Sequence, residues 1–367
     1  MKIACEYSTT DDLAIARSCG VAPSSVSQTM AVQLSQAQMD SFLGTCPSRH
    51  DCVQALHHFQ VETYQTLGGE LVNQVVRQAI SESVWQYPYL MHMVIAVSSG
   101  HQRRLFNGTG QERGLRKLDL AEATHWHQGL QLYQAELARK DAPPGPGRTD
   151  FDALLAAMFL TIVFTFANGD RTLERTMIPH GNTFVEQIIT PMASTGGFRA
   201  LQAVPATPSR DSLWLPVFEA ADDGNGSFTS TQQGIEGLPP ALVELCELGQ
   251  WSSSELDPYH KILRHLTPLL QMQSAPSSMN RIFAFGGRLH STFRPLIQQN
   301  DAQALLLLCW WLALLRQVDE WWVRAWAEKS CHNIVTYLSL ISDRRIQALL
   351  VYPATFGAAD ISWIWNE

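Results

Sequence analysis

Apolar residues recur along this chain at the three- and four-residue spacing of an α-helix, and the pattern returns in one segment after another. We predict helices over the segments that carry it, which are residues 53–67, 70–81, 88–104, 115–140, 151–166, 238–249, 258–270, 302–340 and 344–351. A short helix is also expected near 30–43. Strand signals are weak by comparison, since only isolated stretches such as 178–190 have a strand-like composition. The pattern therefore predicts an all-α protein.

The same pattern predicts how the chain is organised. Residues 1–50 are rich in Ser, Thr and Gln and read as a loosely ordered arm, whereas 53–353 form a single large helical domain and 354–367 a tail packed on it. A Pro- and Gly-rich stretch at 141–147 predicts a surface loop between two helices. Residues 168–237 are less regular, and 221–237 read as a mobile loop.

One apolar run stands out. Residues 304–315 are all apolar, contain no Gly or Pro, and are too few to span a bilayer, which needs about 20 residues. They predict a helix buried on every side. If that helix continues or only kinks near Gln317, then Trp311, Trp322 and Trp326 fall along one stripe with Leu315 and Val318. Such a stripe packs a core or walls a flat apolar ligand, and the residues alone favour the core.

Composition narrows the class of partner. Charged residues make up 16% of the chain and the net charge is −8, which argues against broad nucleic-acid binding. So low a charged fraction indicates surface that is buried or covered by a partner, either another protein or a second copy in a homodimer. The seven cysteines include no Cys-x-x-Cys pair, so no zinc knuckle or redox motif is expected. No signal peptide or membrane span is predicted, and we expect an intracellular protein, in either the nucleus or the cytoplasm.

Catalytic and metal motifs are missing from the sequence. The twelve histidines include no pair spaced to chelate a metal from one helix face, and no phosphate loop, nucleophile elbow or dinucleotide fingerprint occurs. We predict no metal and no cofactor. Polar residues within apolar helices remain as low-ranked catalytic candidates, each more often a satisfied core or surface group: His58, Tyr64, His92, His101 and Glu320.

Several segments together resemble a known family. Residues 55–64 (ALHHFQVETY) and 89–101 (YLMHMVIAVSSGH) look like the opening of the regulatory domain of fungal zinc-cluster transcription factors, of the sterol uptake control type. The paired tryptophans at 310–311 and 321–322, then 333–338 and the closing Tyr352-Pro353-Ala354, are similar to its C-terminal helices. The resemblance covers roughly residues 53–353. It implies an apolar ligand cavity between these tryptophan helices and the 91–97 helix, for which we expect as lining Met91, Ile95, Trp310, Trp311, Trp321, Trp322 and Trp326.

This chain departs from the family at its N-terminus. Family members bind DNA through a six-cysteine cluster that holds two zinc ions and is followed by a basic linker. Here Cys5, Cys19, Cys46 and Cys52 have the wrong spacing, and residues 1–50 contain only Lys2, Arg17 and Arg49 as basic residues. Direct DNA binding is therefore not expected.

Three functions remain open at this point. The first is a regulator-like domain that binds a hydrophobic small molecule, of sterol, terpenoid or polyketide type, and acts through protein partners. The second is an enzyme of fungal secondary metabolism, in which the same pocket folds a reactive substrate for a cofactor-free cyclisation or pericyclic reaction. The third is a truncated zinc-cluster transcription factor whose cysteine cluster lies upstream.

Overall fold

The chain divides into two compact units, Met1–Arg49 and His50–Glu367, and the fold described below is that of the second unit. The computed structural model describes residues 48–107, 112–138, 148–173, 183–202, 212–221, 232–272, 278–355 and 357–365. The predicted helix near 30–43 and most of the predicted arm lie outside these residues, as do residues 222–231 of the predicted loop.

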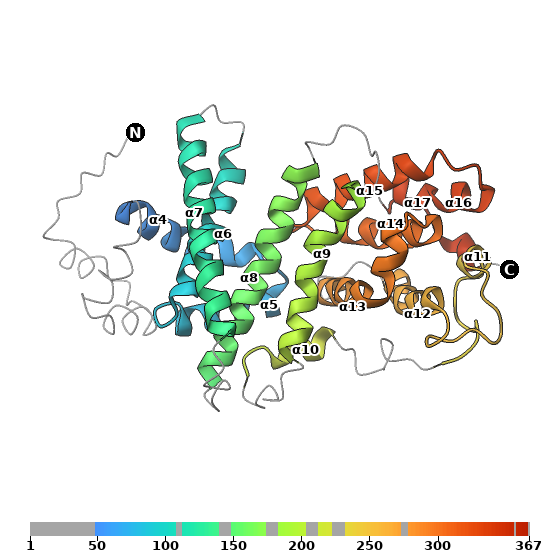
Figure 1. Cartoon of the computed structure of the whole chain (residues 1–367), viewed down its shortest axis with the longest axis horizontal. Coiled ribbons are helices and arrows are strands. Elements are labelled where there is room, and N and C mark those ends of the chain that lie inside the picture. The colour runs from blue at the N-terminus through green and yellow to red at the C-terminus, as the bar shows by residue number, and fades with distance from the viewer. Residues whose placement is uncertain are drawn as a thin grey trace, which may run out of the picture. The chain divides into compact units, whose positions relative to one another are not determined.

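The described residues are helical and contain no strand, which confirms the predicted all-α class (Figure 1). The α-helices, in chain order, are α4 (Arg49–Val61), α5 (Glu70–Ser83), α6 (Pro88–Phe106), α7 (Glu112–Leu137), α8 (Arg148–Leu173), α9 (Thr183–Gln202), α10 (Leu215–Ala221), α11 (Pro240–Leu245), α12 (Pro258–Gln271), α13 (Ser278–Gln298), α14 (Ala302–Arg316), α15 (Arg324–Leu338), α16 (Arg344–Leu349) and α17 (Val351–Ala354). Two 3-10 turns, η1 (Thr63–Thr66) and η2 (Ser362–Trp365), complete the fold.

Several helices begin where an aspartate can cap them. The Asp257 carboxylate accepts hydrogen bonds from the backbone N–H groups of Tyr259 and His260 at the start of α12. Asp301 does the same for the backbone N–H of Ala304, at 2.8 Å, at the start of α14. A side-chain oxygen at this position satisfies a backbone donor that the first turn leaves without an intrahelical partner. These helix starts are therefore determined by residues close by in the sequence.

Helices α9, α10 and α13 were not predicted from the sequence. Residues 183–202 form α9, so the strand suggested within 178–190 is wrong for the described part of that stretch. Residues 278–298 form α13, where the apolar pattern predicted no element. Helix α9 is apolar on most sides, carries Pro191 and includes a Gly-Gly pair, and these features hide a helical period. Packing of α9 between α8 and α13 favours the helix over its weak local propensity.

The predicted long helix over 302–340 is in fact two helices. Helix α14 ends at Arg316 and α15 begins at Arg324, with a turn between them, so the tryptophans at 321 and 322 do not continue the stripe of Trp311. In this turn the Trp321 indole N–H donates to Thr66 Oγ1 at 3.0 Å, and that of Trp322 donates to the Leu67 carbonyl at 3.2 Å. These bonds join the turn to residues 255 positions earlier in the chain.

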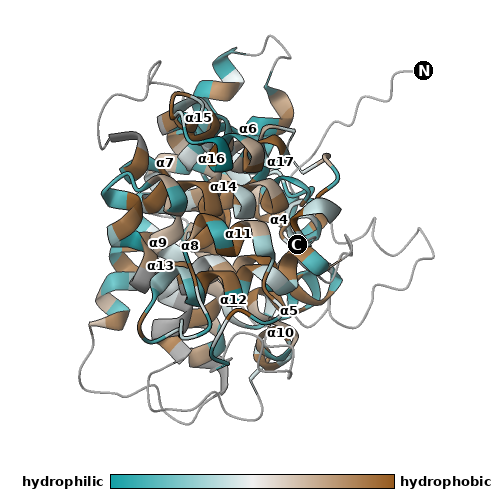
Figure 2. Ribbon diagram, turned by 90° about the vertical axis from the view of Figure 1, so that its right-hand side faces the viewer, coloured by the Kyte–Doolittle hydropathy of each residue, from teal (hydrophilic) through white to brown (hydrophobic). Residues whose placement is uncertain are grey.

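Helix α14 lies at the centre of the C-terminal helices, as its brown ribbon among the neighbouring helices shows (Figure 2). All twelve residues of the predicted apolar run are buried, including Cys309, which contacts Cys331. Helix α8 is the one described helix whose length and composition would allow it to cross a membrane. Because 61% of its most apolar stretch is buried against other helices, we interpret α8 as a core helix and not as a membrane-spanning one.

Replacing Gly286 with alanine is expected to destabilise the protein by about 1–3 kcal/mol, because an added Cβ would overpack the core. That Cβ would lie 2.6 Å from Cζ2 of Trp311, whose ring is fully buried and whose N–H is bonded to the Ile282 carbonyl. Urea denaturation measures the change. In α9, a Cβ added at Gly196 would have no atom within 4 Å, so Gly196→Ala should instead stabilise by about 0.5–1 kcal/mol. Equal stability of the two variants would contradict the packing.

Candidate functional site

The strongest candidate site surrounds Trp321, where three parts of the chain meet. The His101 ring of α6 stacks on the Trp321 indole with ring centroids 4.9 Å apart and planes 22° apart. On its other side His101 Nδ1 lies 3.0 Å from Thr63 Oγ1 of η1 and 3.3 Å from His58 Nε2 of α4. We call these residues, with Thr66 and Glu320, the Trp321 site. His101 is buried, whereas Trp321, His58 and Glu320 each keep part of their surface accessible.

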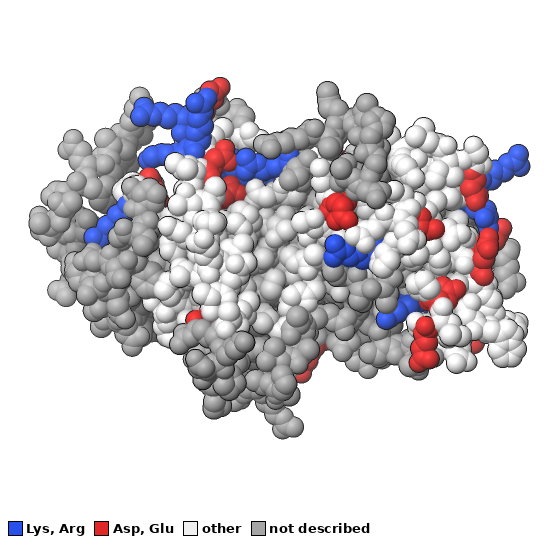
Figure 3. Space-filling model, in the orientation of Figure 1, with Lys and Arg blue, Asp and Glu red and all other residues white. Residues whose placement is uncertain are grey.

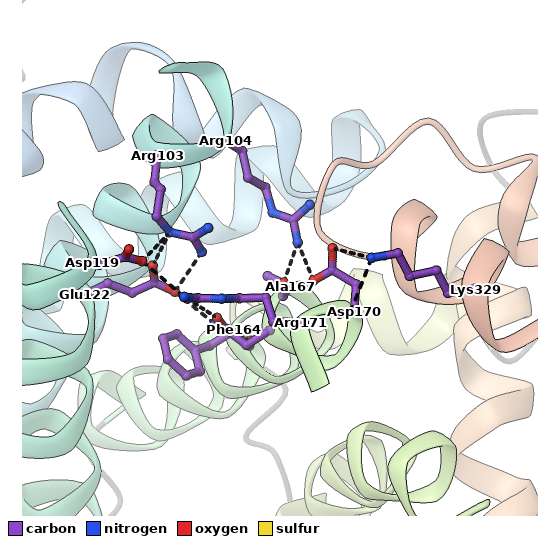
Figure 4. A network of polar contacts seen from close by, with 10 residues as sticks. Arg103, Arg104, Asp119, Glu122, Phe164, Ala167, Asp170, Arg171 and Lys329 are labelled. Carbon is purple, nitrogen blue, oxygen red and sulfur yellow. Dashed lines mark hydrogen bonds and ion pairs between the residues drawn. The ribbon is translucent and has the colours of Figure 1, made fainter. Parts of the chain in front are cut away.

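Arg104 joins the Trp321 site to a polar network (Figure 4). Its guanidinium carbon lies 5.6 Å from the centroid of the Trp321 ring, a cation–π contact. The same guanidinium donates to the Ala167 carbonyl and to Asp170 Oδ1 of α8, the latter at 3.0 Å. Lys329 of α15 donates to the Asp170 carbonyl at 3.3 Å. Helices α6, α8 and α15 are thus tied together beside Trp321.

A second branch of this network runs to α7. Arg103 Nε donates to Glu122 Oε2 at 2.8 Å and also pairs with Asp119 at 3.1 Å. The buried Glu122 carboxylate accepts a further bond from the Asn168 amide at 2.9 Å. It can lie this close to α6 because residue 100 is a glycine, whose Cβ would otherwise stand 3.2 Å from that carboxylate.

Burial sets the protonation of the site. Desolvation, followed by the nearby His58 and Arg104, lowers the pKa of His101 to about 4. Burial also lowers the pKa of His58 below its ordinary value. Desolvation and the adjacent Asp319 raise the pKa of Glu320 to about 7. At neutral pH the site therefore holds neutral imidazoles and a carboxyl group that can still carry its proton.

His92 lies elsewhere, in a separate buried cluster. Its Nδ1 is 2.8 Å from Nδ1 of His125 in α7, and His125 Nε2 is 3.4 Å from the Cys52 thiol. Burial, and then His125, lowers the pKa of His92 to about 4. Nine residues separate His92 from His101 on α6, which is about 13 Å along a helix. The structure thus brings His58 and His101 together beside Trp321 and leaves His92 apart. Glu320 is the residue before Trp321 in the turn between α14 and α15, and Tyr64 follows Thr63 in η1 and lies under the Arg77 guanidinium.

Acid is expected to destabilise the fold through these histidines. The unfolded chain takes up protons at His92 and His101 near pH 6.5, whereas the folded chain does so only near pH 4, so stability is complete above pH 6.5 and falls between the two. Each residue contributes up to about 3 kcal/mol of this loss by pH 4. Glu320 acts in the opposite sense, since the fold retains its proton up to about pH 7, and so offsets part of the loss above pH 4.5.

Urea denaturation of the wild type and of His92→Asn and His101→Asn variants, repeated between pH 4.5 and 7.5, isolates these contributions. The difference in unfolding free energy between wild type and each variant should shrink as the pH falls. A difference that stays constant across this range would show that the imidazoles are not held neutral by burial.

The other predicted ligand-binding residues form part of the core. The side chains of Trp310, Trp311, Trp322 and Trp326 are at most 1% exposed, and Met91 and Ile95 are buried in α6. The indole N–H of Trp310 donates to the Leu349 carbonyl at 3.0 Å, as those of Trp311 and Trp322 do to other carbonyls. The Trp326 N–H is buried without a hydrogen-bond partner. Ligand contact by these six residues stays a prediction.

Sequence reasoning missed the charged half of the site. The apolar pattern gave no role to Arg103 and Arg104, whereas the structure pairs both with carboxylates of other helices. Their position two and three residues after His101, on an otherwise apolar helix, was the available signal. Among the residues that the structure describes, no group of three His, Cys, Asp or Glu side chains is placed to hold a metal ion.

The protein is thus an all-helical domain in which the aromatic Trp321 site adjoins a network of ion pairs. This arrangement defines a class of fold, but it does not by itself indicate an activity. No protein family profile matches the chain, and no solved structure matches it. It is similar to sterol uptake control protein 2 of Saccharomyces cerevisiae (strain ATCC 204508 / S288c), with 22% identity over 275 residues. The match covers 72% of this chain but only 27% of that protein. The similarity supports a distant relationship to a fungal transcription factor.

Proposed function

We propose that this chain is a regulatory helical domain that binds a hydrophobic small molecule at the Trp321 site and passes the bound state to a protein partner. The proposal rests on the similarity to a sterol uptake control protein over most of this chain. An origin from a transcription regulator also favours an intracellular, nuclear location. A sterol, terpenoid or polyketide is the class of ligand that we infer, because an apolar ring system would stack on the accessible part of an indole.

One observation supports Trp321 as the position of the ligand in this proposal. Trp321 lies in the turn between α14 and α15 and is partly accessible. Its indole contacts Thr66 and His101, which belong to the N-terminal half of the chain. A ligand that stacks there contacts elements far apart in the sequence. A ligand that prefers one arrangement of those elements shifts their population, which is sufficient for a sensor. His58 or Glu320 would bond a ligand hydroxyl.

Titration with a fluorescent sterol tests this function. We expect saturable binding, quenching of tryptophan fluorescence and a higher melting temperature, because the ligand binds only the folded chain. Trp321→Ala should weaken binding at least tenfold while the protein stays folded, since the removed side chain is not part of the fully buried core. Trp363→Ala, another partly exposed tryptophan, is the matched control. Binding that is unchanged by Trp321→Ala would reject this site, and the absence of any binding would reject the ligand class.

A second candidate function is a cofactor-free cyclase or pericyclase, and Glu320 is the observation that favours it. A carboxyl group with a pKa of about 7 beside an aromatic wall can donate a proton at neutral pH. Incubation with a reactive polyene or terpenoid precursor should then form product faster than buffer alone, and Glu320→Gln should abolish the gain while retaining binding. Binding without turnover favours the regulator.

The third candidate is a portion of a longer zinc-cluster transcription factor, which agrees with the 27% share of the relative that is matched. Reading the gene upstream tests it. An in-frame cluster of six cysteines followed by basic residues would support this candidate and restore DNA binding as an expectation.

A further inference from the structure

The two most exposed large apolar side chains of the described residues lie in one connection between helices, away from the Trp321 site. Trp251 is 90% exposed and Leu256 is 83% exposed, and both belong to the connection between α11 and α12. We call residues 246–257 the Trp251 loop. Burial of one such side chain is worth roughly 1.5–3 kcal/mol, and the fold itself gains none of this free energy at Trp251 and Leu256, so a partner that covers them would gain it.

The Trp251 loop is held in place by hydrogen bonds and has a defined shape. The Gly249 N–H donates to Ser252 Oγ at 3.0 Å, and the Ser252 carbonyl accepts from the Gly234 N–H at 2.8 Å. Farther on, the Ser253 carbonyl accepts from the N–H groups of Leu256 and Asp257, at 3.2 and 2.9 Å. Trp251 is therefore displayed by an ordered support, which lowers the entropy lost when a partner covers it.

The surroundings of the Trp251 loop are acidic. The stretch 232–257 contains five acidic residues and no Lys or Arg, and four of the five are exposed: Glu236, Glu244, Glu247 and Glu255. Figure 3 shows several carboxylates on the right-hand side, where α11 and α12 lie, with Lys and Arg side chains between them. Two arginines contact this surface: Arg345 lies 3.7 Å from Glu247 and also pairs with Asp343 at 3.0 Å, and Arg264 of α12 donates to the Glu236 carbonyl at 2.7 Å. The surface thus keeps an excess of negative charge.

The exposed apolar side chains and the carboxylates around them indicate the chemistry of a binding partner. An aromatic and an aliphatic side chain in the middle of carboxylates fit a surface that is apolar in its centre and basic at its edges. Nucleic acids and anionic membranes carry the wrong charge. An amphipathic helix with Lys or Arg beside its apolar face presents the required pattern.

We propose that the Trp251 loop is a docking site for a cationic amphipathic helix of another protein. Trp251 and Leu256 are covered by the apolar face of that helix, and the surrounding glutamates pair with its basic residues. This interaction is independent of ligand binding at the Trp321 site and supplies a route by which this chain can join a larger assembly.

The test uses a labelled 18-residue helix of leucine and lysine as the probe, with a leucine and glutamate helix as its counterpart. We expect saturable binding of the cationic probe by the full chain, measured as fluorescence anisotropy, and none of the acidic one. Trp251→Ala should weaken binding about tenfold or more, as expected of a central aromatic residue. Glu255→Lys should weaken it severalfold at 50 mM salt and by less at 300 mM salt, because salt screens the charges.

Matched controls lie on α7. Leu120 is 64% exposed, and Leu120→Ala removes an exposed apolar side chain, while Glu112→Lys reverses an exposed charge; neither should change probe binding. Absence of saturable binding, equal loss in the α7 variants, or binding unaffected by Trp251→Ala would each overturn the proposal. Sedimentation that shows a dimer of the wild type and a monomer of Trp251→Ala would overturn it as well, because the occupant would then be a second copy of this chain.

Discussion

Replacing Trp322 with alanine is expected to lower the free energy of unfolding by about 3–5 kcal/mol, as for other truncations of large buried aromatics. Its side chain is 1% exposed, and its ring stacks on Phe283 with centroids 5.0 Å apart and meets Phe166 edge-on at 6.0 Å. The substitution also leaves the Leu67 carbonyl without its indole donor. Helix α13, helix α8 and the residue that follows η1 lose a common contact.

Urea denaturation followed by circular dichroism measures this change, and Trp251→Ala is its control because that side chain is 90% exposed. The control should unfold close to the wild-type midpoint. If Trp322→Ala also unfolds there but loses sterol binding, then the indole faces a ligand space, as the sequence resemblance implied, and does not pack the core.

Replacing Glu122 with alanine is expected to cost about 3 kcal/mol of unfolding free energy, because it removes one partner of a buried ion pair. Glu122 is 3% exposed and holds Arg103 at 2.8 Å together with the Asn168 amide. The Arg103 side chain is only 15% exposed, so water replaces little of the lost interaction. Asp119 remains as a second partner, which keeps the expected loss near the lower end for such pairs.

Glu112→Ala provides the comparison within the same helix. Glu112 and Arg116 form an ion pair 3.9 Å long in which both side chains are more than four-fifths exposed, and such pairs contribute little to stability. The midpoint of urea denaturation should hardly move. A loss for Glu122→Ala no larger than for Glu112→Ala would show that the network in Figure 4 is solvated and does not join the helices.

Residue spacing predicted those helices whose apolar face or N-terminal cap is determined by residues close together in the sequence. Helix α12 begins at a proline that follows an aspartate cap, and it has one apolar and one polar face. Its predicted span of 258–270 differs from the observed Pro258–Gln271 by one residue. The same reasoning placed α5, α6 and α14 at their observed starts. It failed for α9 and α13, in which proline and glycine interrupt the pattern and neighbouring helices stabilise the conformation.

The candidate site depended more strongly on tertiary structure. The residue types alone nominated His58, His101, Glu320 and Trp321 as polar or aromatic groups within apolar segments, without any relation among them. No local pattern shows that Trp321 bonds to a threonine 255 positions earlier or that Arg104 covers its ring. Such contacts arise when helices from both halves of the chain pack together.

The sequence by itself determined the helical class, the position of the most apolar helix and the lack of a zinc-cluster spacing, because these follow from composition, periodicity and residue spacing. Only the tertiary structure decided that the tryptophan segment breaks after Arg316, that His92 and His101 belong to separate clusters, and that two arginines are paired with carboxylates. The physical reason is that burial and pairing depend on which helices meet, and the free energy of those long-range contacts exceeds the local preference of the residues involved.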